Sequence, residues 1–187
     1  MVKLLTLPDP ISIEIYCDAS FAPKLGVGVG AFAVVKNPTD KLAPNISTEV
    51  FQAATCGRLE FLVAIWALEF FFSLCNTSTL DSSGSDKLRT ITLYTDSRSI
   101  ADLPRRRDKL VANKFTSQRT GGPLANSDLY QKFLRVFDDL NLQIHWLKGH
   151  TAKSLRSVEG EVFAKIDQAA RKQLRSYLKS ADLGPSG

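Results

Sequence analysis

The chain has 187 residues, of which 44% are hydrophobic and 23% are charged. This length and balance fit one folded domain with a single core and exclude a disordered chain. The longest apolar run, residues 61–72, is too short to span a bilayer, and residues 1–10 lack the pattern of a secretory signal. We therefore expect a single domain over residues 1–187, with a core of about 11–180, a flexible tail at 184–187 and no membrane partner.

Cysteine and charge patterns indicate where the protein works and what it could bind. Cys17, Cys56 and Cys75 are an odd number without close-paired spacing, which argues against a disulfide framework or a zinc site and predicts a cytoplasmic protein. The net charge is +5, and two segments hold many of the basic residues: Arg105, Arg106, Arg107, Lys109, Lys114 and Arg119 in the first, and Lys165, Arg171, Lys172, Arg175 and Lys179 in the second. Each is either a solvated surface or a phosphate-binding footprint, and charge alone does not decide between them.

The first half of the chain predicts three strands and a helix. Apolar and polar residues alternate over residues 11–17, a turn covers residues 21–26, and a glycine-containing, β-branched run covers residues 27–36. A third strand is predicted over residues 47–53, so these segments form an antiparallel meander. Residues 57–74 are apolar on almost every side, which indicates a helix buried on most of its surface.

The second half alternates loops, strands and helices. Its predicted elements, in chain order, are a polar loop (76–86), a strand (90–95), a short helix capped by Ser97 and ending before Pro104, the basic segment, a loop (121–123), a helix (126–140), a strand (142–147) and a helix (158–183). The whole order predicts an α/β domain. Its five-stranded mixed sheet combines an antiparallel meander with parallel strands and is flanked by helices.

Four acidic residues stand where a surface role does not explain them. Asp18 ends the first predicted strand and Asp96 follows the fourth, and open α/β sheets place ligands at such strand ends. Glu60 lies in the first turn of the apolar helix, and Asp167 has apolar neighbours in the last helix. A contact with the helix dipole, worth about 0.3–1 kcal/mol, explains an acid near a helix start but not its placement against the core.

Such a set of carboxylates is typical of a metal site. Carboxylates gathered near a core repel one another and lose hydration unless a cation joins them. Hard divalent ions that prefer oxygen ligands, such as Mg²⁺ or Mn²⁺, remove this repulsion. Two such ions about 4 Å apart activate a water molecule and stabilise the leaving oxygen in phosphodiester cleavage. Spacing alone leaves two interpretations open, a two-metal site and four unrelated acids.

Motifs along nearly the whole chain resemble the type 1 ribonuclease H family, from about residue 13 to residue 171. They comprise residues 16–20 with the glycine-spaced strand after them, 55–69 around the glutamate, 95–97, 126–130, 145–150 and 164–171. The Asp-Ala-Ser sequence at the first aspartate is a form found in retroelement members. Each motif is weak singly, whereas their order and their positions on the predicted elements form a specific signal.

The resemblance implies a ribonuclease H-like fold and an endonuclease that hydrolyses the RNA strand of RNA–DNA hybrids. It implies two Mg²⁺ or Mn²⁺ ions held by Asp18, Glu60, Asp96 and Asp167. His150 would lie on a loop after the last strand and assist proton transfer or product release. The nucleic-acid contacts carried over are Asn126 and a basic protrusion formed by Arg105, Arg106, Arg107, Lys109, Lys114 and Arg119.

The chain departs from the family pattern at substrate positions. Cys56 and Gly57 replace asparagines that contact the nucleic-acid backbone, and Arg98 replaces a common glutamine. The linker from His150 to Asp167 is longer than usual. These changes concern substrate binding more than the metal site. A non-catalytic nucleic-acid-binding domain and a related polynucleotidyl transferase such as a resolvase stay open, and the chain is expected to be a monomer or part of a larger polyprotein such as a reverse transcriptase.

Overall fold

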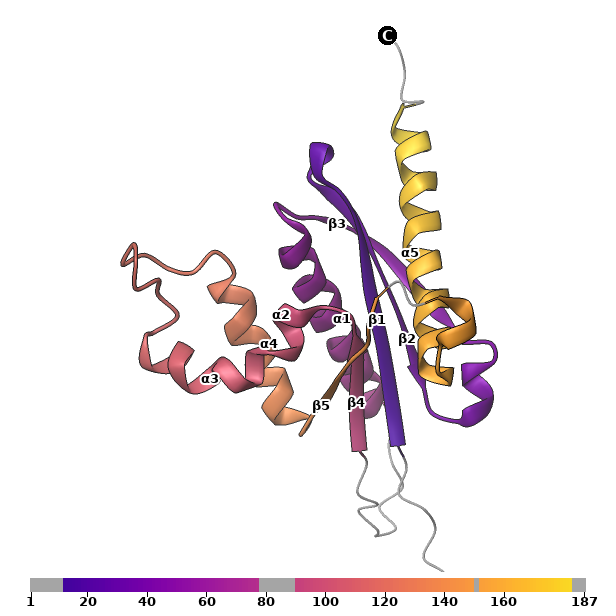
Figure 1. Ribbon diagram of the computed structural model, residues 1–187, viewed down its shortest axis with the longest axis horizontal. Helices are drawn as coiled ribbons and strands as arrows, with labels where there is room; N and C mark the ends of the chain where they lie inside the picture. Colours follow the sequence, from indigo (N-terminus) through magenta and orange to yellow (C-terminus); the bar gives the residue numbers. More distant parts are fainter. Residues whose placement is uncertain (1–11, 78–89, 150–151, 183–187) are drawn as a thin grey trace, which may run out of the picture.

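A five-stranded sheet with helices on both faces builds the domain (Figure 1). The computed structural model describes residues 12–77, 90–149 and 152–182. Its elements are β1 (Ser12–Ala22), η1 (Pro23–Leu25), β2 (Val27–Val35), η2 (Pro38–Lys41), β3 (Ile46–Gln52), α1 (Cys56–Thr77), β4 (Thr90–Thr95), α2 (Arg98–Ala101), α3 (Leu103–Ala112), α4 (Ser127–Asp139), β5 (Gln143–Trp146), η3 (Lys153–Leu155) and α5 (Val158–Asp182). The strand order is β3-β2-β1-β4-β5, antiparallel from β1 to β3 and parallel from β1 to β5, which confirms the predicted fold class.

The central strand β1 continues past the point where the sequence predicted its end. The alternation of apolar and polar residues stops at Cys17, but pairing with β2 extends as far as Ala22. Strand β4, in contrast, pairs with β1 only as far as Tyr16 and Tyr94. Asp18 therefore lies inside β1, just beyond the point where β1 and β4 separate, and the prediction that it ends the strand is wrong.

Two glycines of β2 allow helix α1 to pack closely on the sheet. A Cβ atom at Gly28 would overlap the side chain of Leu59, and one at Gly30 would overlap Val63. Larger residues at either position would push α1 away from the sheet, because protein interiors leave no free volume to absorb them. Since Glu60 follows Leu59 on α1, this close packing also sets the height of Glu60 above the sheet.

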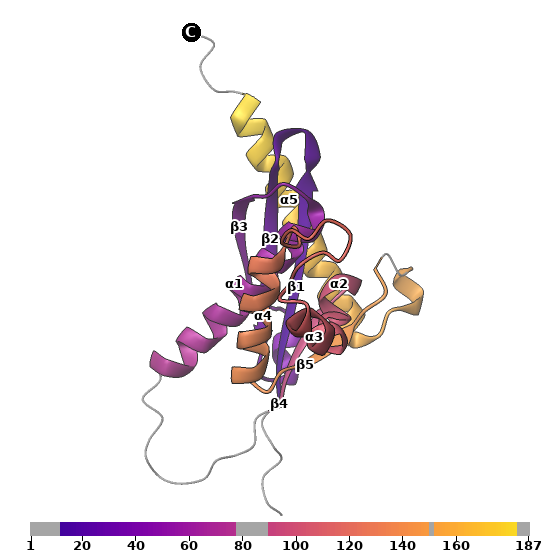
Figure 2. The same cartoon turned by 90° about the vertical axis from the view of Figure 1, so that its left-hand side faces the viewer.

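The second half of α1 is more exposed than predicted. Leu59 and Leu68 are fully buried, whereas Phe70, Phe72 and Leu74 are 39%, 46% and 37% exposed. Figure 2 shows this end of α1 projecting beyond the strands, so no sheet surface covers it. The prediction of a helix buried on most sides is therefore correct for the first turns and wrong for the last ones.

The two faces of the sheet carry separate cores. On one face, α1, α3 and α4 pack against side chains such as Ile15 and Leu93. On the other face, α5 packs Ile166 and Ala170 against Tyr16 and its neighbours. Both views show α5 running along the sheet toward the β1–β2 hairpin (Figures 1 and 2). Helix α5 thereby brings its polar residues Asp167 and Arg171 to the same cleft as Asp18.

The short helix after β4 begins and ends where the sequence predicted. Ser97 caps α2, and its Oγ accepts a hydrogen bond from the backbone N–H of Ile100 at 3.4 Å. Helix α2 ends at Ala101, before Pro104, as predicted. Pro104 itself stands in the first turn of the next helix, α3, where a proline loses no helical hydrogen bond. The first basic residues are therefore helical. The predicted loop over residues 76–86 lies mostly outside the described residues, and its first two residues belong to α1.

No helix within the described ranges has both the length and the apolar character needed to cross a membrane.

Candidate active site

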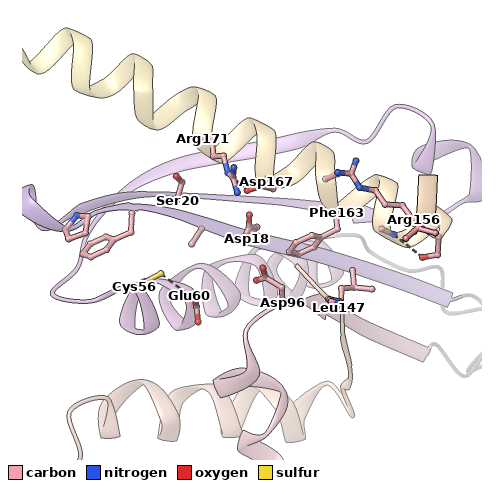
Figure 3. A pocket seen from close by; sticks show the side chains of 18 residues that line it. Asp18, Ser20, Cys56, Glu60, Asp96, Leu147, Arg156, Phe163, Asp167 and Arg171 are labelled. Atoms are coloured by element: carbon pink, nitrogen blue, oxygen red, sulfur yellow. Dashed lines mark hydrogen bonds and ion pairs between the residues drawn. The ribbon is translucent and has the colours of Figure 1, made fainter. Parts of the chain in front are cut away.

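A cleft of about 690 Å³ opens where β1 and β4 separate. Four carboxylates that are distant in the sequence line it: Asp18 from β1, Glu60 from α1, Asp96 from the end of β4 and Asp167 from α5. In Figure 3, Asp18 lies between Asp167 and Asp96. The structure therefore brings the four predicted acids to one place.

Asp18 carries the clearest electrostatic signature of the cleft. Burial raises the pKa of its carboxyl from 3.8 to about 8, and the negative charge of Asp96 adds to this effect. The carboxylate of Asp167 raises the pKa further, through its charge and a shared hydrogen bond, while the backbone of Ala19 lowers it. The surroundings of Asp18 therefore disfavour its charged form as long as no cation is bound beside it.

The β5 strand and the loop after it hold Asp96 in place. The indole Nε1 of Trp146 donates a hydrogen bond to the backbone carbonyl of Asp96 at 2.9 Å. The guanidinium of Arg98 stacks on the same indole, 3.3 Å from the ring centroid. Gly149 approaches from the other side, since a Cβ atom there would lie 2.6 Å from Asp96 Oδ2. Arg98, which stands where the family commonly has a glutamine, thus packs on Trp146, and Trp146 in turn holds Asp96.

Glu60 is held at the edge of the cleft by two donors. The Ser97 hydroxyl donates to Glu60 Oε2 at 2.5 Å, and the Cys56 thiol donates to Glu60 Oε1 at 3.6 Å. Figure 3 shows the second contact, which turns Glu60 toward Cys56. Burial, followed by the charge of Glu60, raises the pKa of the Cys56 thiol to about 11, so the thiol stays protonated and can donate.

Asp167 is balanced by a neighbour on its own helix. Arg171 Nε lies 2.6 Å from Asp167 Oδ1, one turn further along α5, and both side chains are partly exposed. Arg171 also lines the cleft, so a positive charge stands at its α5 wall. An exposed pair of this kind adds little stability, about 0.3–0.5 kcal/mol. Its main effect is to orient the Asp167 carboxylate.

The donor set of the cleft fits a hard divalent cation. Within the described ranges, no three His, Cys, Asp or Glu side chains already stand close enough together to hold a metal ion. In this structure Glu60 instead accepts a hydrogen bond from Ser97, and Asp167 pairs with Arg171. Rotation about side-chain bonds changes such distances without moving the backbone. Four carboxylates offer oxygen ligands only, which suit Mg²⁺ or Mn²⁺ better than a softer ion.

Comparison with known proteins identifies the family. The sequence profile described as RNase H matches residues 10–175, which is most of the chain. The chain belongs to the ribonuclease H family. A comparison with curated proteins gives no match.

Solved structures of ribonucleases H share the fold of this family member. LC9-RNase H1, a type 1 enzyme with the type 2 active-site motif, is 17% identical, with a TM-score of 0.58 over 89% of this chain and 74% of that one. The N-terminal RNase H domain of rv2228c from Mycobacterium tuberculosis is 13% identical, with a TM-score of 0.56 over 91% and 99% of the two chains. The prototype foamy virus protease–reverse transcriptase is 17% identical, with a TM-score of 0.56 over 90% of this chain and 21% of that one. These neighbours show the fold, and the family match supports nuclease activity of the ribonuclease H type.

The other predicted site residues lie away from the cleft or outside the described residues. His150 lies outside the described residues. Asn126 is half-buried at the start of α4 and does not line the cleft. The basic residues of α3 and the loop after it do not line the cleft either: Arg105, Arg106, Arg107, Lys109, Lys114 and Arg119. Their role in substrate binding stays a prediction.

Two arginines of this basic segment have carboxylate partners. Both terminal nitrogens of Arg107 donate to Asp138 of α4, at 2.5 and 2.6 Å. Arg105 pairs with Asp102 at 2.9 Å and is 80% exposed. Arg107 therefore joins α3 to α4, and its guanidinium is less available to a phosphate than the others.

Sequence reasoning missed several residues of the cleft. Lys148 and Arg156 are among the residues that line it, and they bring positive charge to the cleft. Ser97 was recognised as a helix cap but not as a donor to Glu60, and Gly149 was not recognised as the neighbour of Asp96. The motif around residues 148–150 contained the signal for Lys148 and Gly149, whereas no local pattern marks Arg156.

Proposed function

We propose that this protein is an endonuclease that hydrolyses the RNA strand of RNA–DNA hybrids, with Asp18, Glu60, Asp96 and Asp167 as ligands of two Mg²⁺ or Mn²⁺ ions. One observation carries the proposal: in a member of the ribonuclease H family, four carboxylates from four separate elements line one cleft. The raised pKa of Asp18 supports it, because bound cations would stabilise the ionised carboxylate that the metal-free cleft disfavours.

The chain's own residues orient the ligands. Divalent ions bound there would supply an activated water molecule and stabilise the leaving oxygen. Ser97 and Cys56 keep Glu60 at the cleft edge, and Arg171 orients Asp167. A strand entering this cleft meets positive charge at Lys148 and Arg156 and negative charge at the carboxylates.

Proton transfer and substrate binding complete the proposal. His150, next in the chain after Gly149, is proposed to assist proton transfer or product release. Asn126 and the exposed basic residues are proposed to bind the hybrid: Arg105, Arg106, Lys109, Lys114 and Arg119. Arg107 contributes only if a phosphate displaces Asp138. The wide minor groove of an A-form-like hybrid displays the 2′-hydroxyls that distinguish its RNA strand.

The proposal also covers the extent of the domain, its compartment and whether it acts alone or within a longer chain. We propose one domain over residues 1–187, working in the cytoplasm either as a monomer or within a larger polyprotein. The similarity to a protease–reverse transcriptase, of which the matched part is 21%, supports the second arrangement.

A cleavage assay with strand-specific labels tests the proposal. The substrates are an RNA–DNA hybrid, an RNA duplex, a DNA duplex and a four-way DNA junction of matched sequence, each incubated with Mg²⁺ or Mn²⁺. We expect internal cuts in the RNA strand of the hybrid, abolished by Asp18→Asn and by Asp96→Asn. Binding of the hybrid without cleavage at any metal concentration would instead support a non-catalytic binding domain. Preferential cutting of the junction would support a resolvase.

A further inference from the structure

The second basic segment forms a stripe on α5 that leads away from the cleft. Arg171, Arg175 and Lys179 follow one another at four-residue intervals, so they lie on one side of the helix and rotate by about 40° per step. Lys172 is rotated by about 100° from Arg171, so around the helix axis it lies close to the direction of Lys179. Arg171 lines the cleft, and Figure 3 shows α5 continuing past it. We call Lys172, Arg175 and Lys179 the α5 stripe.

The charges of the α5 stripe are not balanced by neighbouring acids. All three side chains are exposed. None of them forms an ion pair with any described residue. Residues 168–181 contain no Asp or Glu. Positive potential therefore accumulates along this part of the helix.

Helix stability explains little of this pattern. Lys179 lies in the last turn of α5, where a cation interacts favourably with the helix dipole. Lys172 and Arg175 are further from that end, and the dipole effect is confined to the last turn. Lys165 of the same basic segment does have a structural partner, because its Nζ donates to the backbone carbonyl of Leu42 at 2.6 Å. The α5 stripe has no such anchor within the described residues.

The cleft has a wall along α5 that leads toward the stripe. Its α5 wall runs from Arg156, just before the helix, to Arg171, and its opposite wall runs from Asp18 to Pro23. The helical part of this wall, from Gly160 to Arg171, is about 16 Å long, which exceeds the size of one phosphodiester group. The stripe continues this wall for about 12 Å, or three to four nucleotide steps of about 3.4 Å. An extended polyanion lying in the cleft would thus pass the stripe.

We propose that Lys172, Arg175 and Lys179 bind backbone phosphates of the nucleic-acid strand where it leaves the cleft, about two to five nucleotide steps from the cleaved bond. This inference rests on the proposed nuclease function. A nucleic acid fits better than a membrane surface, because the exposed residues beside the stripe are polar and offer no apolar side chain for insertion: Gln168, Ser176 and Ser180.

Binding of a long hybrid by a charge-neutralised variant tests the proposal. The variant is Arg175→Gln with Lys179→Gln, and the matched control is Arg135→Gln with Lys36→Gln, which removes the same two charges from exposed sites on α4 and after β2. Fluorescence anisotropy in EDTA gives the affinity for a hybrid of about 18 base pairs, long enough to fill the cleft and reach past the stripe. Kinetics with Mg²⁺ give kcat and KM.

We expect the stripe variant to bind the hybrid about 5- to 20-fold more weakly at 0.1 M salt, with a shallower salt dependence by about two units of log–log slope. Its kcat should stay unchanged while KM rises, and the charge-retaining pair Arg175→Lys with Lys179→Arg should keep wild-type affinity. The control should change affinity by less than about twofold. An unfolded variant would be recognised by its circular dichroism, and single substitutions then replace the pair.

Three results would overturn the proposal. Hybrid affinity of the stripe variant equal to that of wild type is one, and an equal loss in the control is another. The third is a variant that keeps hybrid affinity but loses binding to vesicles containing phosphatidylserine. Because affinity is measured without metal, hybrid binding that depends on the stripe without any cleavage would support the stripe and refute the nuclease proposal. Cleavage of the hybrid by a protein whose hybrid affinity does not depend on the stripe would support the nuclease proposal and refute the stripe proposal.

Discussion

Replacing Asp18 by asparagine is expected to stabilise the metal-free protein while it abolishes cleavage. In the folded chain the pKa of Asp18 is raised to about 8 by burial first, and then by the charge of Asp96. Between an ordinary pKa near 3.8 and this value, the unfolded chain releases its proton while the folded chain retains it. The free energy of unfolding therefore falls as the pH rises from about 4 to about 8. An asparagine carries no charge at any of these pH values, so the variant does not lose stability through this side chain as the pH rises.

The size of the effect follows from the pKa difference. One pKa unit corresponds to about 1.4 kcal/mol, so a rigid, unrelieved Asp18 would destabilise the protein by up to about 4 kcal/mol at pH 7. The carboxyl faces a solvent-filled cleft and can turn toward water, which reduces the penalty. We expect Asp18→Asn to raise the free energy of unfolding by about 1–3 kcal/mol at pH 7 and by almost nothing near pH 4.

Urea unfolding in EDTA at several pH values between about 4 and 8 measures this difference. The wild type should lose stability as the pH rises, and Asp18→Asn should show a flatter profile. Mg²⁺ should then stabilise the wild type and not the variant, because a ligand stabilises the state that binds it. Asp139→Asn, at an exposed position in the last turn of α4, is the matched control and should follow the wild type. An Asp18→Asn profile parallel to that of the wild type would refute the reasoning.

Two further substitutions probe the neighbours of the carboxylates. Gly149→Ala places a Cβ atom 2.6 Å from Asp96 Oδ2, so the flexible carboxylate must move, and the cleavage rate should fall about 10- to 100-fold with little change in Tm. Gly122→Ala, whose Cβ would meet no atom closer than 3.9 Å, is the control, and equal rates for the two variants would contradict the prediction. Ser97→Ala removes both the α2 cap and the donor to Glu60, so unfolding should need about 1–2 kcal/mol less and cleavage should slow, whereas Ser97→Thr should retain both. Denaturation would measure the free energy of unfolding of the Ser97 variants, and single-turnover kinetics would measure their cleavage rates.

The fold could be predicted largely from local patterns, and its errors arose where distant contacts decide. Apolar alternation over residues 90–95 and the cap at Ser97 located β4 and Asp96 correctly. The end of β1 was wrong because the pairing that extends it to Ala22 comes from β2, which no alternation in residues 18–22 reveals. The short helix after Ser97 does end before Pro104, as predicted. The helix α3 that follows was not predicted, because a proline is compatible both with a loop after a helix and with the first turn of the next helix.

In the candidate site, too, local patterns predicted some residues, whereas others depend on distant contacts. Local context and family resemblance pointed to the four acids, and the structure brings them to one cleft. Their partners could not be predicted in this way, since the contact between Ser97 and Glu60 joins residues 37 positions apart. The charge pattern likewise did not show that Arg107 is occupied by Asp138, 31 positions away. Such pairs depend on how helices pack over the sheet and not on neighbours in sequence.

The central claim is that carboxylates from β1, α1, β4 and α5 share one divalent-cation site. Electron paramagnetic resonance of Mn²⁺ added to the wild type, Asp18→Asn, Asp167→Asn and the control Asp139→Asn tests it most directly. The account predicts that the wild type and the control bind Mn²⁺, and that each of the other two variants loses at least about tenfold in affinity. Equal Mn²⁺ affinity in the wild type and Asp18→Asn would contradict it.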